Sequence, residues 1–192
     1  MREASLGDGA VWLSLPVESD IDAITAYCRH STIAEWTTVP VPYVRTDAQK
    51  FVVDVVPAGW SARTPTWAIR RRENAPLIGM VSLHEIDTGA AEIGFWLAPK
   101  QRGQGLMSTA VRLVCAYAFA PEGMGLVRVE WRGFVGNLAS AAVVRRLGFR
   151  YEGMLRRAGP QRGRMRDIWI AGRLDTDPPW PAADWPAETV GG

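Results

Sequence analysis

The chain has 192 residues, which is enough for one sizeable domain and short for two. With 47% hydrophobic and 22% charged residues it is typical of a soluble globular protein, and its net charge of +2 argues for neither a nucleic-acid nor a membrane partner. Two cysteines favour reduced thiols over a disulfide framework, and no secretory signal or membrane-spanning run is visible. We therefore expect a cytoplasmic protein without membrane contact.

The N-terminal part of the chain predicts one strand and two helices. The strand covers Val11–Leu15. A helix is predicted at Ile21–Arg29, and a Thr46…Gln49 capping-box pattern opens a second helix that continues to about Val56. This region is therefore expected to be mostly helical.

Aromatic residues flank the second of these helices. Before it, Trp36 and Tyr43 bracket a loop that contains two prolines. After it, Pro57 and Gly59 predict a break in the chain, with Trp60 exposed beside them. We expect Trp36, Tyr43 and Trp60 to wall a substrate pocket, and the equal alternative is simple packing under a long loop.

The middle of the chain changes to the period-two pattern of strands. Thr66–Arg71, Leu77–Ile86 and Glu92–Leu97 are joined by short turns, the second of them at Asp87–Gly89. Three consecutive strands with short turns predict an antiparallel meander.

Two helices and three strands are predicted to follow. A helix after Gly105 crosses over to a strand that runs parallel to its predecessor, and Asn137 caps a further helix that ends near Leu147. The strands are Leu126–Trp131, Phe149–Leu155 and Asp167–Leu174. We predict a single domain at residues 1–174. Residues 175–192 are predicted to be a Pro/Trp-rich tail, extended and draped on the domain or disordered.

Residues 92–119 are predicted to form a strand, a glycine loop and a helix. Lys100–Gly105 is a basic turn, and apolar residues recur on one helical face at Met107, Ala110, Val111, Val114, Cys115 and Ala118. A glycine turn before a helix presents unpaired N–H groups at the positive end of the helix dipole, where phosphates bind. The Walker and dinucleotide patterns fit poorly, because Leu106–Met107 and Ser108 stand where those motifs need other residues. A pyrophosphate cradle and a purely structural turn both remain open.

A second motif favours the cradle. Asn137–Phe149 has an Asn-x-Ala-Ser start and a Leu-Gly-Phe end, and it resembles the closing half of a GCN5-related N-acetyltransferase (GNAT), more narrowly of the ribosomal-protein alanine N-acetyltransferase (RimJ/RimL-like) branch. Lys100–Gly105 is similar to that family's acyl-CoA loop, Arg/Gln-x-x-Gly-x-Gly/Ala. Glu152–Arg156 and Arg166–Asp167 resemble that branch's last strands. The resemblance covers about residues 10–174.

The resemblance implies an α/β (α+β) fold: a central mixed, mostly antiparallel sheet of about seven strands, flanked by about four helices and splayed between the fourth and fifth strands. It also implies acetyl-CoA, or another short acyl-CoA, as donor for direct transfer to a primary amine in a ternary complex. The acceptor is a protein N-terminal amine or a small-molecule amine, and the sequence does not choose. The alternatives are a non-catalytic acyl-CoA-binding module and an RNA-associated adaptor. A homodimer is one option for the oligomeric state.

The implied acyl-CoA site combines loop N–H groups for the pyrophosphate, a strand edge for the pantetheine arm and the first turn of the second motif's helix. Its residues are Phe95, Trp96, Leu97, Arg102, Gly103, Gln104, Gly105, Leu106, Met107, Ser108, Asn137 and Ser140.

The resemblance specifies the catalytic groups less closely than the acyl-CoA site. Glu92 is the first choice for the general base and Glu85 the second, because an α-amine with a pKa of about 8 needs only a weak base. Either glutamate could instead pair with an arginine at the surface. Many relatives carry a tyrosine acid seven residues after Asn137, where this chain has Val144. The resemblance offers Ser140, three residues after Asn137, as the family's other candidate for the donor to the leaving thiolate. The alternative is that Ser140 only satisfies the helical turn.

The two histidines and an arginine-rich stretch carry no specific functional motif. His30 and His84 lie too far apart for a metal motif, so no metal is predicted. Eight arginines between Arg145 and Arg166 could meet the CoA 3′-phosphate, an acidic substrate or RNA, or could form a solvated hairpin loop. Nucleic acid is the disfavoured partner.

Overall fold

The computed structural model describes residues 3–87 and 89–190, and the side chains at 85–87 lie outside this description. The chain divides into two compact units. The first unit comprises Met1–His84 and Gly94–Val114, and the second comprises Glu85–Ile93 and Cys115–Gly192. Strand β5 (Ala90–Leu97) and helix α5 (Leu106–Phe119) each cross the boundary.

In the described residues the strands form one eight-stranded sheet in the order β1-β2-β3-β4-β5-β6-β8-β7. Within the described pairings only β5 and β6 run parallel, through residues 90–92 and 128–130. The predicted α/β class, the mostly antiparallel sheet and the parallel crossover are confirmed. The sheet has one strand more than expected, because β1 (Leu6–Gly7) is too short to show a period-two pattern. The expected splay of the sheet stays a prediction.

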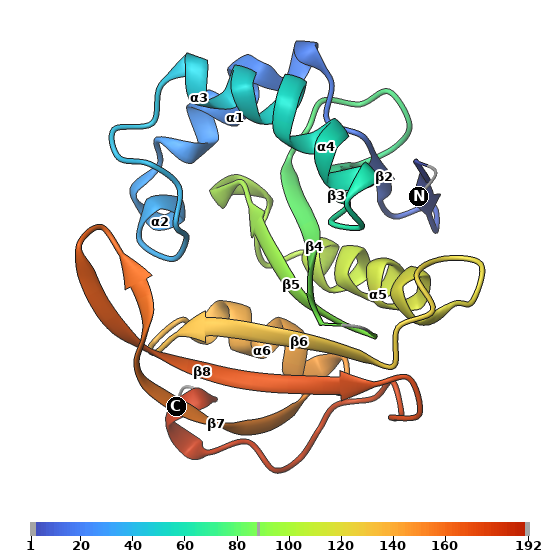
Figure 1. The fold of residues 1–192 in the computed structure, drawn as a ribbon, viewed down its shortest axis with the longest axis vertical. Helices are drawn as coiled ribbons and strands as arrows, with labels where there is room; N and C mark the ends of the chain where they lie inside the picture. Colours follow the sequence, from blue (N-terminus) through green and yellow to red (C-terminus); the bar gives the residue numbers. More distant parts are fainter. Residues whose placement is uncertain (1–2, 88, 191–192) are drawn as a thin grey trace. The chain divides into compact units, whose positions relative to one another are not determined.

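The first unit holds three more strands and a group of helices. The strands are β2 (Trp12–Ser14), β3 (Thr66–Arg70) and β4 (Gly79–Asp87), the last ending in the second unit. The helices are α1 (Ile21–Cys28), α2 (Ser31–Ala34), α3 (Arg45–Lys50) and α4 (Val56–Ser61), and a π-helical turn at Phe51–Val55 joins α3 to α4. Figure 1 shows α1, α3 and α4 gathered together. The turn predicted after β4 includes Thr88, which lies outside the described residues.

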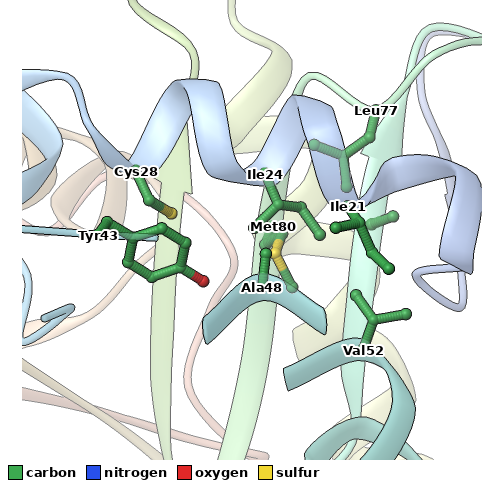
Figure 2. Packing of buried hydrophobic residues seen from close by; sticks show 9 residues of the cluster. Ile21, Ile24, Cys28, Tyr43, Ala48, Val52, Leu77 and Met80 are labelled. Carbon is green, nitrogen blue, oxygen red and sulfur yellow. The ribbon is translucent and has the colours of Figure 1, made fainter. Parts of the chain in front are cut away.

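The core of the first unit lies between these helices and the sheet (Figure 2). Ile21 and Ile24 of α1 are spaced to share one helical face, and they point toward Ala48, Val52 and Met80. All five side chains are at most 5% exposed. Removing this apolar surface from water is the main force that holds the helices on the sheet.

The predicted break at Pro57 and Gly59 is wrong. Pro57 lies in the first turn of α4, directly after the π-helical turn, and the helical run continues through it to Ser61. Trp60 is only 2% exposed, and its ring meets that of Trp67 edge-on with centroids 5.0 Å apart. The expected exposure of Trp60 is therefore wrong as well, because the continuing helix turns this ring into the core. Its part in a substrate pocket stays a prediction.

The second unit contains the end of the sheet and one further helix. Its elements are β6 (Arg128–Phe134), α6 (Leu138–Arg146), β7 (Arg150–Gln161) and β8 (Arg164–Leu174). β7 and β8 are longer than predicted, because a two-residue turn joins them at Arg162 and Gly163, with φ of 47° and 74°. Residues 156–166, which separate the two predicted strands, are therefore mostly strand.

The tail packs within the second unit. Trp185 is 7% exposed, and a short 3-10 helix forms at Ala187–Thr189. Its described part, residues 175–190, is therefore draped on the unit, as one of the two expectations had it.

Helix α5 buries the face predicted from its pattern. Met107 is 7% exposed, and Ala110, Val111, Val114, Cys115 and Ala118 are 0% exposed. Cys115 and Cys28 are both free thiols. In the described part of the chain, no helix is both long and apolar enough to cross a bilayer.

Candidate active site

The glycine loop joins β5 to α5 in the first unit. Gly103 and Gly105 both have φ of +75°, and nothing lies within 4 Å of the position that a Cβ would take at either one. Backbone conformation, rather than crowding, therefore requires glycine here. α5 begins at Leu106, and the N–H of Thr109 donates to the carbonyl of Gly105 at 3.0 Å. The N–H groups of residues 106–108 are at the positive end of the helix dipole, available to an external acceptor.

Arginine side chains brace this loop. Nε of Arg102 donates to the carbonyl of Leu97 at 3.1 Å, which ties the loop to the end of β5, and partial burial lowers the pKa of Arg102. Arg71, directly after β3, donates to the amide oxygens of Gln101 (2.8 Å) and Gln104. Sequence reasoning missed Arg71, because no motif spacing links it to partners about thirty residues away.

A cavity of about 180 Å³ opens in the first unit between α1, the loop after α2 and strands β4 and β5. Its walls are Ile24, Cys28, Thr37, Val39, Tyr43, Phe51, Thr66, Met80, Ser82, Gly94, Phe95 and Trp96. Burial raises the pKa of the Cys28 thiol to about 12 and also raises that of the Tyr43 hydroxyl. Both groups therefore stay protonated near neutral pH. The wall is uncharged and mainly apolar.

Of the two other residues expected in a substrate pocket, only one lines this cavity. Tyr43 lies in the cavity wall, whereas Trp36 is half-buried and is not among the lining residues. Phe95 and Trp96, expected at the acyl-CoA strand edge, also line the cavity. Sequence reasoning missed Cys28, because the two cysteines were weighed only for a disulfide framework.

Glu92 lies in a chain of charged side chains in the second unit. It pairs across the sheet with Glu130, and Nε of Arg132 lies 3.8 Å from Oε2 of Glu92 and 2.6 Å from Oε1 of Glu130. Arg128 extends the chain with ion pairs to Glu130 (3.0 Å) and Glu152 (2.5 Å). Burial raises the pKa of Glu92, the positive charge of Arg132 opposes that rise, and the negative charge of Glu130 adds to it.

Glu85 is the second candidate for the general base. The side chain of Glu85 lies outside the described part of the structure. Its role stays a prediction.

Helix α6 begins as the sequence predicts. Oδ1 of Asn137 accepts from the N–H of Ser140 at 3.2 Å, which makes Asn137 the N-cap. Oγ of Ser140 accepts from the indole Nε1 of Trp131 at 2.9 Å. A hydroxyl that accepts a hydrogen bond still holds a proton to donate. Val144, at the position of the family's tyrosine, is 0% exposed.

The histidines take part in local contacts. His30 accepts from the N–H of Thr32 through Nδ1, and Nε2 of His84 lies 3.0 Å from Oγ of Ser82. Across residues 3–87 and 89–190, no group of three His, Cys, Asp or Glu side chains has the arrangement of a metal site.

The family now follows from a comparison with known proteins. A family model described as "Acetyltransferase (GNAT) domain" matches residues 11–150, which include the glycine loop and α6. The chain belongs to the GNAT acetyltransferase family. The resemblance drawn from Lys100–Gly105 and Asn137–Phe149 is confirmed.

Curated relatives match over shorter stretches. The chain is 44% identical over 82 residues to YdaF of Bacillus subtilis (strain 168), covering 42% of this chain and 44% of YdaF. It is 39% identical over 85 residues to the ribosomal-protein-serine acetyltransferase of Escherichia coli (strain K12), covering 43% of this chain and 46% of that protein. The chain thus spans about half the length of the curated relatives it matches.

Solved structures show the same fold. RimL, a ribosomal L7/L12 alpha-N-protein acetyltransferase in complex with coenzyme A, matches with a TM-score of 0.78 at 23% identity, covering 89% of this chain and 98% of that one. The microcin C7 self-immunity acetyltransferase MccE, in complex with acetyl-CoA and AMP, matches with a TM-score of 0.77 at 20% identity, covering 87% and 93%. These likenesses establish the GNAT fold.

Proposed function

We propose that the protein is an N-acetyltransferase that transfers the acetyl group of acetyl-CoA directly to a primary amine in a ternary complex. The observation that carries this is the GNAT domain match, which includes a glycine loop whose backbone leaves a helix N-terminus for an anion. When bound, acetyl-CoA supplies an acetyl group activated as a thioester.

The glycine loop suits the pyrophosphate of acetyl-CoA. The N–H groups of residues 106–108 would donate to its oxygens, and the guanidinium of Arg102 adds a positive charge beside them. The absence of side chains at Gly103 and Gly105 lets a phosphate approach the backbone. The backbone of Phe95–Leu97 would pair with the pantetheine amides as an added strand does. The same groups would serve another short acyl-CoA, because they bind the part that all such donors share.

Glu92 is the proposed general base. Its raised pKa makes the carboxylate a stronger base at neutral pH than an ordinary glutamate. The carboxylate would take a proton from the ammonium group. The neutral amine nitrogen would then bond to the acetyl carbon as the carbon–sulfur bond breaks, and the second proton of that nitrogen would pass through water to the departing sulfur.

Ser140 is the proposed hydrogen-bond donor to the sulfur that leaves. Its oxygen already accepts from Trp131, so its own proton is directed elsewhere. A serine hydroxyl is too weak an acid to give up this proton, and we expect it to stabilise the thiolate until the proton released by the acylated nitrogen reaches the sulfur through water. Buried Val144 supplies no acid in its place.

The cavity supports an acceptor whose amine is attached to an uncharged group. A second positive charge, as in a polyamine or an aminoglycoside, would lie against walls without a counter-charge, which is costly. A protein N-terminus with a small uncharged first residue, or a small apolar amine, fits better. We therefore rank these acceptors above polycationic ones.

An acceptor screen that measures CoA release tests the function. Peptides beginning with alanine, serine, leucine, lysine or aspartate would be compared with phenethylamine and spermine. We expect turnover with uncharged N-termini or the apolar amine, and about tenfold less or none with lysine-first peptides and spermine. Acetyl-CoA binding without release on any amine would instead support a non-catalytic acyl-CoA-binding module, which Val144 at the tyrosine position favours as the second candidate.

A further inference from the structure

The proline- and tryptophan-rich tail is anchored to the helix that carries Ser140. Asp177 pairs with Arg150 at the start of β7, with Nη2 and Oδ1 2.8 Å apart. The N–H of Ala182 donates to the carbonyl of Arg145, in the last turn of α6, at 3.1 Å. These contacts hold the tail against β7 and α6 at separate points along its length.

Trp185 then inserts into the second unit. Its indole N–H donates to the carbonyl of Phe149 at 2.9 Å, and its ring centroid lies 5.6 Å from that of Tyr151 and 6.1 Å from that of Trp131. Trp185 is 7% exposed, whereas Trp180 of the same tail is 65% exposed. The tail thus buries one of its two tryptophans and leaves the other in solvent.

The ring that Trp185 contacts is the one that reaches the candidate site. Trp131 is 2% exposed, and its Nε1 donates to Oγ of Ser140. A Cβ at Gly133 would stand 2.2 Å from Cζ2 of Trp131, so the ring occupies space that only glycine leaves open. Gly133 and Trp185 together confine the indole, and the confined indole sets the direction of its hydrogen bond to Ser140.

We propose that residues 177–190 act as a strap in which Trp185 is a positioning residue for Ser140, acting through the indole of Trp131. This rests on the proposed function, because it assigns consequences to the orientation of the Ser140 hydroxyl in acetyl transfer. The strap lies outside the family match, which ends at residue 150. Loss of the strap is expected to slow acetyl transfer without weakening the affinity for acetyl-CoA, since the glycine loop belongs to the first unit.

The contact itself is tested without any activity, by two-dimensional ¹⁵N–¹H NMR of the indole groups of the full chain. Trp131→Phe assigns the Trp131 signal by deleting it. We expect Ser140→Ala and Trp185→Ala to shift that signal, Trp185→Phe to shift it less, and the exposed control Trp180→Phe to leave it in place. If the Trp131 signal shifts in neither Trp185 variant, although both variants are folded and show a thermal unfolding transition, the strap proposal is wrong.

Kinetics test its consequence. Trp185→Phe and Trp131→Phe are expected to lower kcat by about three- to tenfold, the effect of one hydrogen bond, with the KM for acetyl-CoA changed by less than about twofold. Trp131→Phe should cost nothing further in a Ser140→Ala background, because the two residues act as one unit. Additive losses, or an equal loss in Trp180→Phe, would contradict the relay. If the wild-type chain acetylates no amine, the proposed function fails while the NMR result still decides whether the strap exists.

Discussion

The two units offer different chemical groups to a ligand. The first presents backbone N–H groups at the start of α5 and a cavity with uncharged walls. The second presents side chains whose character depends on their neighbours, with Glu92 beside Arg132 and Ser140 bonded to Trp131. Changes in the first unit should therefore act on binding, and changes in the second on rate.

The N-termini of α5 and α6 also differ in the groups that they offer to a ligand. At α6 the side chain of Asn137 accepts from a first-turn N–H, so the helix satisfies part of its own start. At α5 the residue before the helix is Gly105, which has no side chain to do so. One helix start is capped by a side chain of its own unit, and the other leaves its first N–H groups for the anion that we propose.

The largest effect is expected at the proposed base. Glu92→Gln should lower kcat about a hundredfold, the usual scale for losing a general base, and leave the acetyl-CoA Kd unchanged. Steady-state kinetics with calorimetry would separate the two quantities. A weaker Kd with an unchanged kcat would place Glu92 in binding rather than in rate.

The pH profile of kcat/KM sharpens that assignment. Because the pKa of Glu92 is raised, the acid side of the profile should lie at higher pH than for an ordinary glutamate. Glu130→Gln removes a negative charge that helps to raise this pKa, so the acid side should move to lower pH. Arg132→Gln removes a positive charge that opposes the rise and should move it the other way. A profile that neither variant moves would exclude Glu92 as the titrating group.

The next largest effect is expected in the glycine loop. Gly105→Ala should weaken acetyl-CoA binding about tenfold, because a residue with a Cβ is strained at φ +75° and shifts the N–H groups. Gly9→Ala is a matched control, since Gly9 also has a positive φ, +89°, and open space around it. Both variants should lose a similar amount of stability, about 1 kcal/mol. Equal affinities by calorimetry would show that the loop does not hold the donor.

The α6 cap should act on stability. Asn137→Ala should remove about 1 kcal/mol and lower the Tm by roughly 2–4 °C in a chain of this size. Asn137→Asp keeps an oxygen that accepts from the Ser140 N–H and should retain most of the stability. Thermal unfolding of the two variants measures this, and an equal loss in both would show that the cap bond is not what stabilises the helix start.

The smallest effect is expected at Arg71. Removing its donors to Gln101 and Gln104 in Arg71→Ala should loosen the loop and weaken acetyl-CoA binding about two- to threefold, as expected for exposed contacts. The exposed neighbour Arg72 provides the control, and Arg72→Ala should leave the Kd unchanged. A larger loss for Arg72 than for Arg71 would contradict this bracing role.

Sequence patterns predicted those parts of the candidate site whose residues lie close together in the chain. The glycine loop, the apolar face of α5 and the Asn137 cap each depend on residues within a few positions of one another. Trp60 was misplaced, because Pro57 was taken as a break although the helical run continues through it from the π-helical turn. Arg71 was missed because its partners are distant in the chain.

By itself, the sequence determined the family and the order of seven of the eight strands in the described residues, because Lys100–Gly105 and Asn137–Phe149 encode turns and caps that short-range backbone geometry dictates, and the strands show a period-two pattern. Only the tertiary structure decided that Glu92 shares an arginine with Glu130, that the cavity is uncharged, and that Trp185 packs against Trp131. These features depend on strand pairing and burial, which bring together residues that no local spacing relates.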